Sequence, residues 1–541
     1  MLDWKAIAKS TLSLLIASLI FLILLPEVIA PFLTNKLERL LNEKLKGFTI
    51  GFSQLELSII NNSISLNKIR FHTKSDDELN RGVGGEIGTI HFQGIHWMKV
   101  LFKKELVIRK IQISDPIIQS PFPGNTKKTL TPELAGISVQ IGTLAIDGLH
   151  LKLVDTLLTN SLLVDEGQIK INNLAISAKD TLSFNLIKKF QFSTKLLQKT
   201  SRDSLYTFNM KGVNYSNVSR QLSIDTITLV PNYSEYAFAN KHPLEVDRFH
   251  INSTNIHIYD VAFEEFILTN NLVCSYGELS KLDLKIFRDK RKPDSHGKKV
   301  LVQDLMHSYP GILRIDSLKV LDGTITYKEH AENAAEAGHI SFNKLNTRIY
   351  QINNDTIHLD PDTKMELYFD ALLMDKARLH LFLKIKLLDP AKTIFFGGHL
   401  SGFDLMALNP IFGRNAFTYV TSGKVESLQF KFQADKVRAR GRMDFRYHDL
   451  RVAVKDPQKD DTIGIKSKLL TFLANKKILD ANPLPDENPR VGVIYYERNP
   501  EKFLLNYCFK ATFSGIKSTI LKPANKKSKT RHKIFNKRKV I

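Results

Sequence analysis

Cysteine is almost absent from this sequence, which has only Cys274 and Cys508 among its 541 residues. Two cysteines so far apart make neither a disulfide framework nor a multi-cysteine metal site. Their positions leave open whether they pair with each other. The compartment of the protein therefore has to be inferred from other features of the chain.

The sequence also lacks the short motifs of common catalytic chemistry. It contains no Gly-x-Ser-x-Gly, His-Glu-x-x-His, Cys-x-x-Cys or Walker phosphate-binding sequence. The glycines from Gly82 to Gly88 precede a strand-like stretch without the dinucleotide-binding spacing, so a hairpin is expected there. The sixteen histidines are scattered along the chain. We therefore predict a non-enzymatic protein with no catalytic residue, metal site or cofactor.

Long hydrophobic runs are scarce, and only one is long enough to cross a membrane. Ser10–Pro26 carries no charge, and the apolar character continues to Leu33. At about 1.5 Å per residue, a helix over Ser10–Leu33 spans a hydrocarbon core of about 30 Å. Residues 1–33 are thus predicted to form a cytoplasmic stub and a transmembrane anchor. The residues expected inside the bilayer are Ser13, Leu15, Ile16, Leu19, Ile20, Phe21, Leu22, Ile23, Leu24 and Leu25.

Two other interpretations of this run remain open. A cleaved signal peptide is suggested by Lys5 and Lys9 before the run and by a weak cleavage-site pattern at Val28–Ala30. Pro31 disfavours cleavage there, because its missing N–H fits a protease poorly. A buried core helix rarely has so little polar character. If the run is an anchor, the short N-terminal stub stays inside and the long body is translocated.

Acidic residues are outnumbered by basic ones, 55 against 77, and the net charge is +22. Such an excess predicts an anionic partner or surface, such as phospholipid headgroups, lipopolysaccharide or nucleic acid. With 43% hydrophobic residues, the chain has enough apolar material to exclude wholesale disorder.

Most of the chain has the period of β-strands, and one pattern recurs in it. The pattern is an apolar residue, two others, an apolar residue, one other and an apolar residue, as in Leu66–Phe71. The last two apolar positions share a strand face, but the first has the opposite parity. A bulge or crossover is therefore expected inside the strand. Further copies begin at Ile87, Ile108, Ile141, Ile171, Ile224, Val246, Ile315 and Val425.

Repeated strands with one apolar face predict a mainly β fold built on an elongated antiparallel sheet. Such a sheet covers its apolar face in one of two ways. It closes on itself as a sandwich or barrel, or it curls into a trough that holds something apolar. The periodicity alone does not choose between them.

Breaks in the strand pattern suggest how the remaining chain is divided. Apolar residues at helical spacing after the anchor predict a short amphipathic helix, and helical spacing returns near the C-terminus. The predicted segments are an amphipathic helix at 34–47, a β-repeat region at 48–287, a basic loop at 288–299, a second β region at 300–465, amphipathic helices at 466–521 and a disordered basic tail at 522–541.

The basic tail contains no acidic residue, and its lysines and arginines are candidate contacts with an anionic surface. Each contributes about 1 kcal/mol near an anionic membrane. A solvated tail without a partner is the simpler alternative. Nucleic acid is not expected, because no aromatic stacking platform is interleaved with the charge. The candidate contacts are Lys526, Lys527, Lys529, Arg531, Lys533, Lys537, Arg538 and Lys539.

Three stretches of the chain resemble the AsmA family of envelope proteins. The hydrophobic run followed by Phe48–Ser58 and the Leu66–Phe71 strand is similar to the N-terminus of that family. Ile315–Ile349 is similar to the middle of AsmA-like chains, and Leu408–Leu450 resembles their C-terminal domain.

The resemblance implies a single-pass inner-membrane protein of a Gram-negative bacterium with its body in the periplasm. It also implies an elongated β-groove related to TamB and to bridge-like lipid-transfer proteins, in which apolar strand faces shield acyl chains. The residues then expected to line the groove are Ile69, Phe71, Ile90, Phe92, Ile111, Ile113, Leu144, Ile146, Leu318, Val320, Leu428 and Phe430.

The function expected from these features is to bind or conduct phospholipid-like molecules along the groove, in support of outer-membrane assembly or homeostasis. The expected partners are a membrane, an acyl-chain lipid and an envelope protein at the C-terminal end. The alternative is a structural scaffold of the cell envelope with a closed β core.

Overall fold

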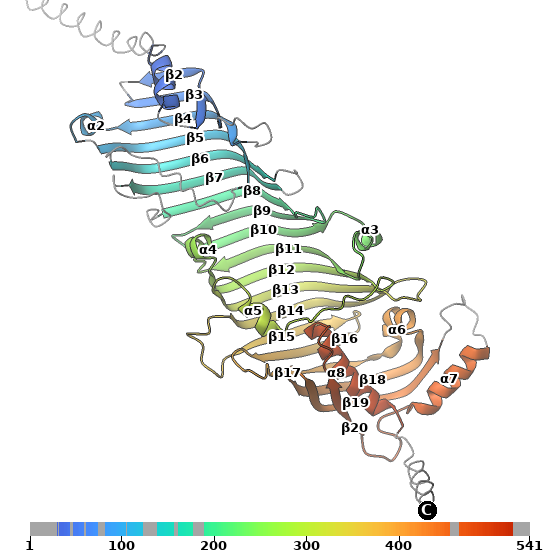
Figure 1. The fold of residues 1–541 in the computed structure, drawn as a ribbon. Helices are drawn as coiled ribbons and strands as arrows, with labels where there is room; N and C mark the ends of the chain where they lie inside the picture. The colour runs from blue at the N-terminus through green and yellow to red at the C-terminus, as the bar shows by residue number, and fades with distance from the viewer. Residues whose placement is uncertain are drawn as a thin grey trace, which may run out of the picture. The chain divides into compact units, whose positions relative to one another are not determined.

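The structure is a computed structural model that describes residues 30, 32–43, 47–58, 61–73, 82–103, 105–122, 138–155, 161–176, 189–454 and 465–522. The protein is mainly β, as predicted, and its twenty described strands belong to one open sheet (Figure 1). The chain divides into two compact units. Unit 1 comprises Met1–Ser234 and His250–Ser280, and unit 2 comprises Glu235–Phe249 and Lys281–Ile541.

After residue 43, the described elements of unit 1 are strands and two short helices. They are β1 (Phe48–Gly51), β2 (Gln54–Ser58), β3 (Ser63–Thr73), β4 (Gly84–Ile95), α2 (Trp97–Lys103), β5 (Glu105–Pro121), β6 (Ser138–Val154), β7 (Ser161–Ile176), β8 (Lys189–Thr200), β9 (Tyr206–Ser216), β10 (Gln221–Pro231) and α4 (Phe263–Thr269). The unit boundary falls within β11 (Asp247–Tyr259) and β12 (Leu272–Asp289).

Unit 2 contains most of the helices. Its elements are α3 (Glu235–Ala239), α5 (Val302–His307), β13 (Leu313–His330), β14 (Gly338–Asn353), β15 (Lys364–Leu373), β16 (Ala377–Lys386), β17 (Ile394–Asp404), η2 (Leu405–Leu408), α6 (Asn409–Asn415), β18 (Thr418–Ala434), β19 (Arg438–Val454), α7 (Ile465–Lys477), β20 (Val491–Glu497) and α8 (Leu504–Ile520). The predicted helices at 466–521 correspond to α7 and α8, but the strand β20 between them was not predicted.

Within each unit, strands that follow one another in sequence lie side by side. The pairs described for the two units are antiparallel with one exception. The exception is β5 with β6, which run parallel from Glu105 beside Ser138 to Pro121 beside Val154. A parallel pair needs a crossover of about a dozen residues or more, and residues 122–137 are long enough to make it. The expectation of an entirely antiparallel sheet is therefore wrong at this one pair.

The kink expected in the apolar repeat is present in β3, but it is made by a left-handed residue and not by the predicted bulge or crossover, so the pairing register is preserved. In β3, Lys68 lies between Leu66 and Ile69 and has a left-handed backbone conformation, with a φ of 51°. Pairing with β4 continues in the same register on both sides of it. Leu66 and Ile69 consequently lie in one buried cluster although they are three residues apart. The left-handed residue thus rotates the strand without adding a residue to it.

The same arrangement recurs in later copies of the repeat. Gly212 of β9 has a φ of 62° and Asn255 of β11 a φ of 52°, and both lie opposite Asp225 of β10. Ile224 and Ile227, on either side of Asp225, belong to one hydrophobic cluster. These kinks lie in register on the two strands that flank β10, and the apolar residues on both sides of them stay in one cluster.

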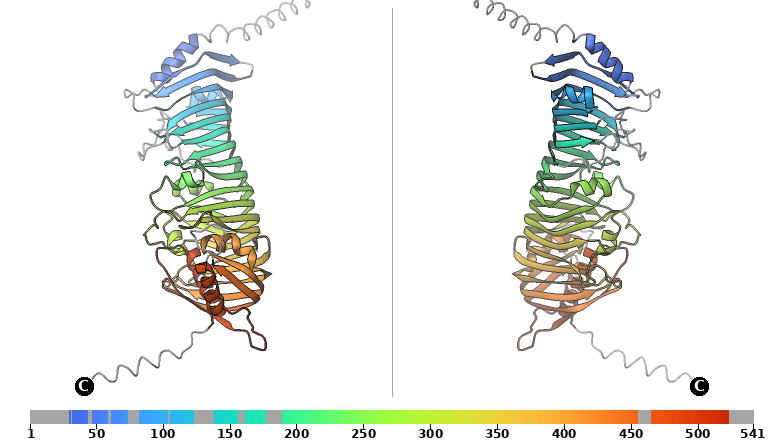
Figure 2. Two further views of the ribbon diagram at one scale, coloured as in Figure 1. Left: turned by 90° about the vertical axis from the view of Figure 1, so that its right-hand side faces the viewer. Right: turned by 90° about the vertical axis from the view of Figure 1, so that its left-hand side faces the viewer.

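Residues 32–43 form a helix at the first strands of unit 1, close to the amphipathic helix predicted at 34–47 (Figure 2). Leu33, Leu37 and Leu41 pack against the buried cluster that includes Phe52 and Leu55. Their spacing of four residues places them on one side of the helix. The predicted apolar stripe therefore covers the start of the sheet.

Candidate functional site

The apolar face of unit 1 is the feature that the sequence singled out as functional. Successive hydrophobic clusters follow this face from β3 to β7 and share members such as Ile90, Phe92 and Ile141. From β4 to β7, every described member of these clusters comes from a strand, and the same holds for the cluster on β8–β12. No described helix contributes a member to these clusters, although Phe263 of α4 packs on Phe190 and Tyr215 at ring-centroid distances of 6.5 and 4.9 Å.

Eight of the predicted groove residues lie in these strands. Ile69 and Ile111 are buried, whereas the other six side chains are only partly buried. Pairing brings several of them together across strands: Ile90 lies opposite Ile113, and Ile113 lies opposite Ile146 in the parallel pair. The partly buried residues are Phe71, Ile90, Phe92, Ile113, Leu144 and Ile146.

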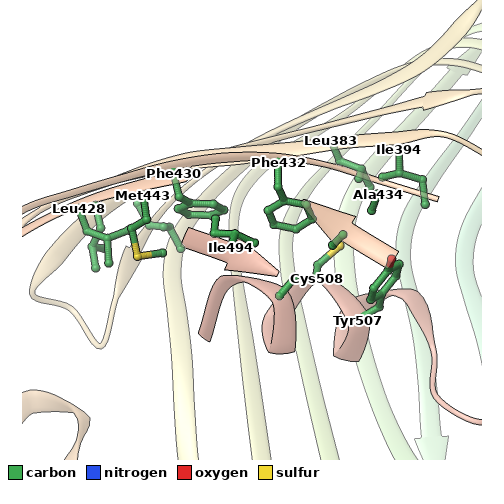
Figure 3. Packing of buried hydrophobic residues seen from close by; sticks show 14 of the residues in the cluster. Leu383, Ile394, Leu428, Phe430, Phe432, Ala434, Met443, Ile494, Tyr507 and Cys508 are labelled. Atoms are coloured by element: carbon green, nitrogen blue, oxygen red, sulfur yellow. The ribbon is translucent and has the colours of Figure 1, made fainter. Parts of the chain in front are cut away.

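The remaining four predicted groove residues lie in unit 2 and have different surroundings. Leu318 is partly buried and Val320 is buried, both in β13. Leu428 and Phe430 of β18 are 6% and 8% exposed and belong to a large core. Figure 3 shows Phe432, Ala434 and Ile494 of the sheet facing Tyr507 and Cys508 of α8. Side chains of the protein itself therefore cover the sheet face at β18.

Helix α8 also closes the edge of the sheet at β20. The backbone N–H of Val493 donates to Ser518 Oγ at 2.7 Å, and that of Tyr495 donates to Ser514 Oγ at 3.1 Å. These two N–H groups would otherwise be free on an edge strand and available for another strand. The hydroxyls of α8 occupy the place of a further strand.

Helix α7 likewise binds edge backbone groups, at the C-terminal end of β19. The side-chain amide of Asn475 accepts from Val452 N at 3.0 Å and donates to Val452 O at 2.7 Å. Val454 N donates to Thr471 Oγ1 at 2.9 Å. Two helices therefore satisfy backbone groups along this edge of unit 2.

The edge strand β1 of unit 1 has a matching cap from the helix over residues 32–43. Ile50 N donates to Asn42 Oδ1 and Asn42 Nδ2 donates to Ile50 O, both at 2.8 Å. Phe52 N donates to Glu38 Oε1 at 2.8 Å. Asparagine is suited to this task, because its amide carries a donor and an acceptor side by side as a peptide group does.

A polar network in unit 2 gathers charged side chains around Arg288. Its guanidinium contacts both carboxylate oxygens of Asp247, with Nε–Oδ1 at 2.7 Å, and lies 3.6 Å from Glu245. Lys502 contacts Asp294 and lies 3.7 Å from Glu245. The basic loop predicted at 288–299 is therefore held inside unit 2 by ion pairs.

Two carboxyl groups of this network have shifted pKa values. Burial, with a hydrogen bond that the protonated Glu245 carboxyl donates to the Asp294 carboxylate, raises the pKa of Glu245. The hydrogen bond from Lys502 lowers the pKa of Asp294 to about 2. Shifted carboxyls occur at functional sites but also in structural ion-pair networks. Each of these has a cationic neighbour, and the backbone N–H of Glu245 donates to Pro293 O at 2.8 Å, so we interpret the network as a structural clamp.

Several sequence predictions fall outside the described residues. These are the bilayer-spanning residues Ser13–Leu25 and the tail residues 526–539. Among the helices that the structure describes, none has the length and apolar character needed to span a bilayer. In the same part of the chain, no group of three or more His, Cys, Asp or Glu side chains is arranged to hold a metal ion. Cys274 and Cys508 are both buried and do not form a disulfide with each other.

No protein-family model matches the chain, and no curated protein matches it significantly.

Proposed function

We propose that the protein binds acyl chains of phospholipid-like molecules on the apolar face of unit 1. The observation that carries this proposal is the contrast between two parts of the molecule. At β18, helix α8 covers the sheet face. On β4–β7, the clusters consist of strand residues alone, and Phe92 and Leu144 are only partly buried. An acyl chain is an occupant of matching chemistry for such a face.

The physical mechanism is passive. Burying a methylene group contributes about 0.8 kcal/mol relative to water. An acyl chain that moves from a bilayer to an apolar strand face keeps most of its burial, so the exchange is nearly balanced and needs no chemical step. Neighbouring strands lie about 4.8 Å apart, so the in-register kinks give a chain an apolar path from one strand to the next.

The biological setting of the proposal rests on the hydrophobic run and the AsmA-like stretches. In this setting the hydrophobic run is a single-pass anchor in the inner membrane, and the body of the protein lies in the periplasm. The protein then has a role in outer-membrane homeostasis. An envelope protein at the C-terminal end belongs to the same proposal.

A scaffold function is the second candidate, and one observation favours it for unit 2. The core of that unit contains Leu428 and Phe430 together with α8 residues, and helix side chains cap its sheet edge. A scaffold needs a closed, self-sufficient core of this kind.

Photo-crosslinking distinguishes the two functions without relying on unfolding. A photo-reactive phenylalanine is introduced in the full chain at Phe92 or at Leu144, in cells whose phospholipids carry radioactive phosphate. The matched control is Gln93, which neighbours Phe92 in β4 but points to the opposite face. We expect labelled lipid adducts from Phe92 and Leu144 and about tenfold less from Gln93.

Equal labelling from Gln93 would mean that contact with lipid does not depend on the apolar face. An absence of adducts at Phe92 and Leu144, with the variants folded by circular dichroism, would refute lipid binding and favour the scaffold.

A further inference from the structure

Helix α7 has the reverse of the usual orientation for a helix on a soluble protein. Its polar residues Thr471 and Asn475 face the protein, where they bind the edge of β19. Its large apolar side chains point outward: Phe472 is 63% exposed, Leu473 44% and Leu470 43%. A surface helix normally turns its apolar stripe to the core and its polar residues to water. These three side chains leave apolar surface exposed on the outward side of α7.

The charges on α7 indicate the chemistry of that partner. Lys468, Lys476 and Lys477 are exposed beside the apolar side chains, and the helix contains no acidic residue. At 100° per residue, Lys476 lies between Phe472 and Leu473, and Lys468 and Lys477 lie on their outer flanks. Exposed apolar side chains interleaved with lysines match the acyl-chain and phosphate parts of an anionic membrane interface.

We propose that the outward face of α7 is a docking site for an anionic phospholipid surface. Phe472, Leu473 and Leu470 enter the boundary between headgroups and acyl chains, while the lysines contact lipid phosphates. Each lysine near such a surface contributes about 1 kcal/mol. Charge complementarity favours this occupant over a second copy of the chain, because two α7 faces would bring only like charges together. The inference does not depend on acyl-chain binding by unit 1.

The attachment of α7 suits it to this role. Asn475 and Thr471 hold the helix by hydrogen bonds to backbone groups of β19, and Ala474 packs against the core of unit 2. The outward residues are thus not the ones that hold α7 on the described fold. Docking then buries apolar area without requiring the core to open.

A fluorescent probe on α7 tests the proposal directly. Leu473→Cys is made in the full chain and labelled with an environment-sensitive dye, while the native Cys274 and Cys508 are protected by burial. The protein is held in phosphatidylcholine nanodiscs and mixed with vesicles of phosphatidylglycerol or of phosphatidylcholine. We expect a blue shift of the dye with phosphatidylglycerol vesicles and at least about tenfold weaker binding to phosphatidylcholine vesicles.

Two matched variants separate insertion from general attraction. The same dye at Glu487→Cys, in an exposed loop of unit 2, should show no shift. Adding Phe472→Ser to the labelled protein should weaken binding about tenfold, because it removes the most exposed apolar side chain. No shift with phosphatidylglycerol, or an equal shift at Glu487→Cys, would overturn the proposal. A shift that grows with protein concentration without vesicles would also overturn it and identify a second copy as the occupant.

Discussion

At the scale of single residues, the strand kinks place individual residues in a left-handed backbone conformation. Lys68, Asn255 and Gly212 hold φ values of 51°, 52° and 62° inside strands. Glycine and asparagine adopt this conformation readily, whereas most other residues pay about 1–2 kcal/mol. Gly212 has a second constraint, because a Cβ atom there would lie 1.9 Å from Asp225 Oδ2.

Gly212→Ala is therefore expected to destabilise unit 1 by about 1–2 kcal/mol, through left-handed strain and displacement of the Asp225 carboxylate. The measurement is the urea midpoint followed by circular dichroism. Gly297→Ala is the matched control, because no atom lies within 4 Å of its Cβ position and its φ is not left-handed. Equal midpoints for the two variants would show that the kink does not constrain this position.

At the scale of elements, helices act as substitutes for missing strands. Asn42 in unit 1 and Asn475 in unit 2 each bind the N–H and C=O of one edge-strand residue. An uncapped edge is a template for pairing with another chain. The capping helices therefore limit the sheet to its own strands.

Asn475→Ala should remove both hydrogen bonds to Val452 and loosen α7, at a cost of about 1–2 kcal/mol. Because the freed edge of β19 becomes available for pairing, self-association should also increase. Urea denaturation measures the first effect and light scattering the second. Asn61→Ala, at an exposed position in unit 1, is the control. Unchanged stability and association in Asn475→Ala would contradict the capping role of this residue.

At the scale of the whole molecule, the net charge of +22 is the dominant electrostatic feature. It attracts the chain to anionic surfaces over a distance of about one Debye length, which is about 10 Å at 0.1 M salt. The lysines of α7 and the basic residues after position 521 belong to the same excess.

Association of the full chain with phosphatidylglycerol vesicles should therefore weaken at least about tenfold between about 0.05 M and about 0.5 M sodium chloride. Lipid adducts at Phe92 should not change over this range, because acyl-chain burial carries no charge. Vesicle flotation and photo-crosslinking measure the two quantities in one preparation. Salt-independent flotation would show that charge does not drive the association.

The sequence by itself determined the mainly β architecture, the kinks and the helices at 32–43, 465–477 and 504–520. These features are local, because the spacing of apolar residues along a few turns or one strand already specifies which side chains share a face. The recurring three-residue step in Leu66–Ile69 was sufficient to predict a kink, although it did not show that neighbouring strands keep their register.

Only the tertiary structure decided the parallel pairing of β5 with β6, the presence of β20 and the coverage of each apolar face. Leu144 and Leu428 hold the same position in the local pattern, yet Leu428 lies in a core that α8 completes and Leu144 lies in a cluster of strand residues alone. The sequence also did not show that α7 turns polar residues toward the protein, because Thr471 and Asn475 contact their partners on β19 only in the folded chain. Periodicity predicts which side chains share a face, but contacts between distant segments decide what that face meets.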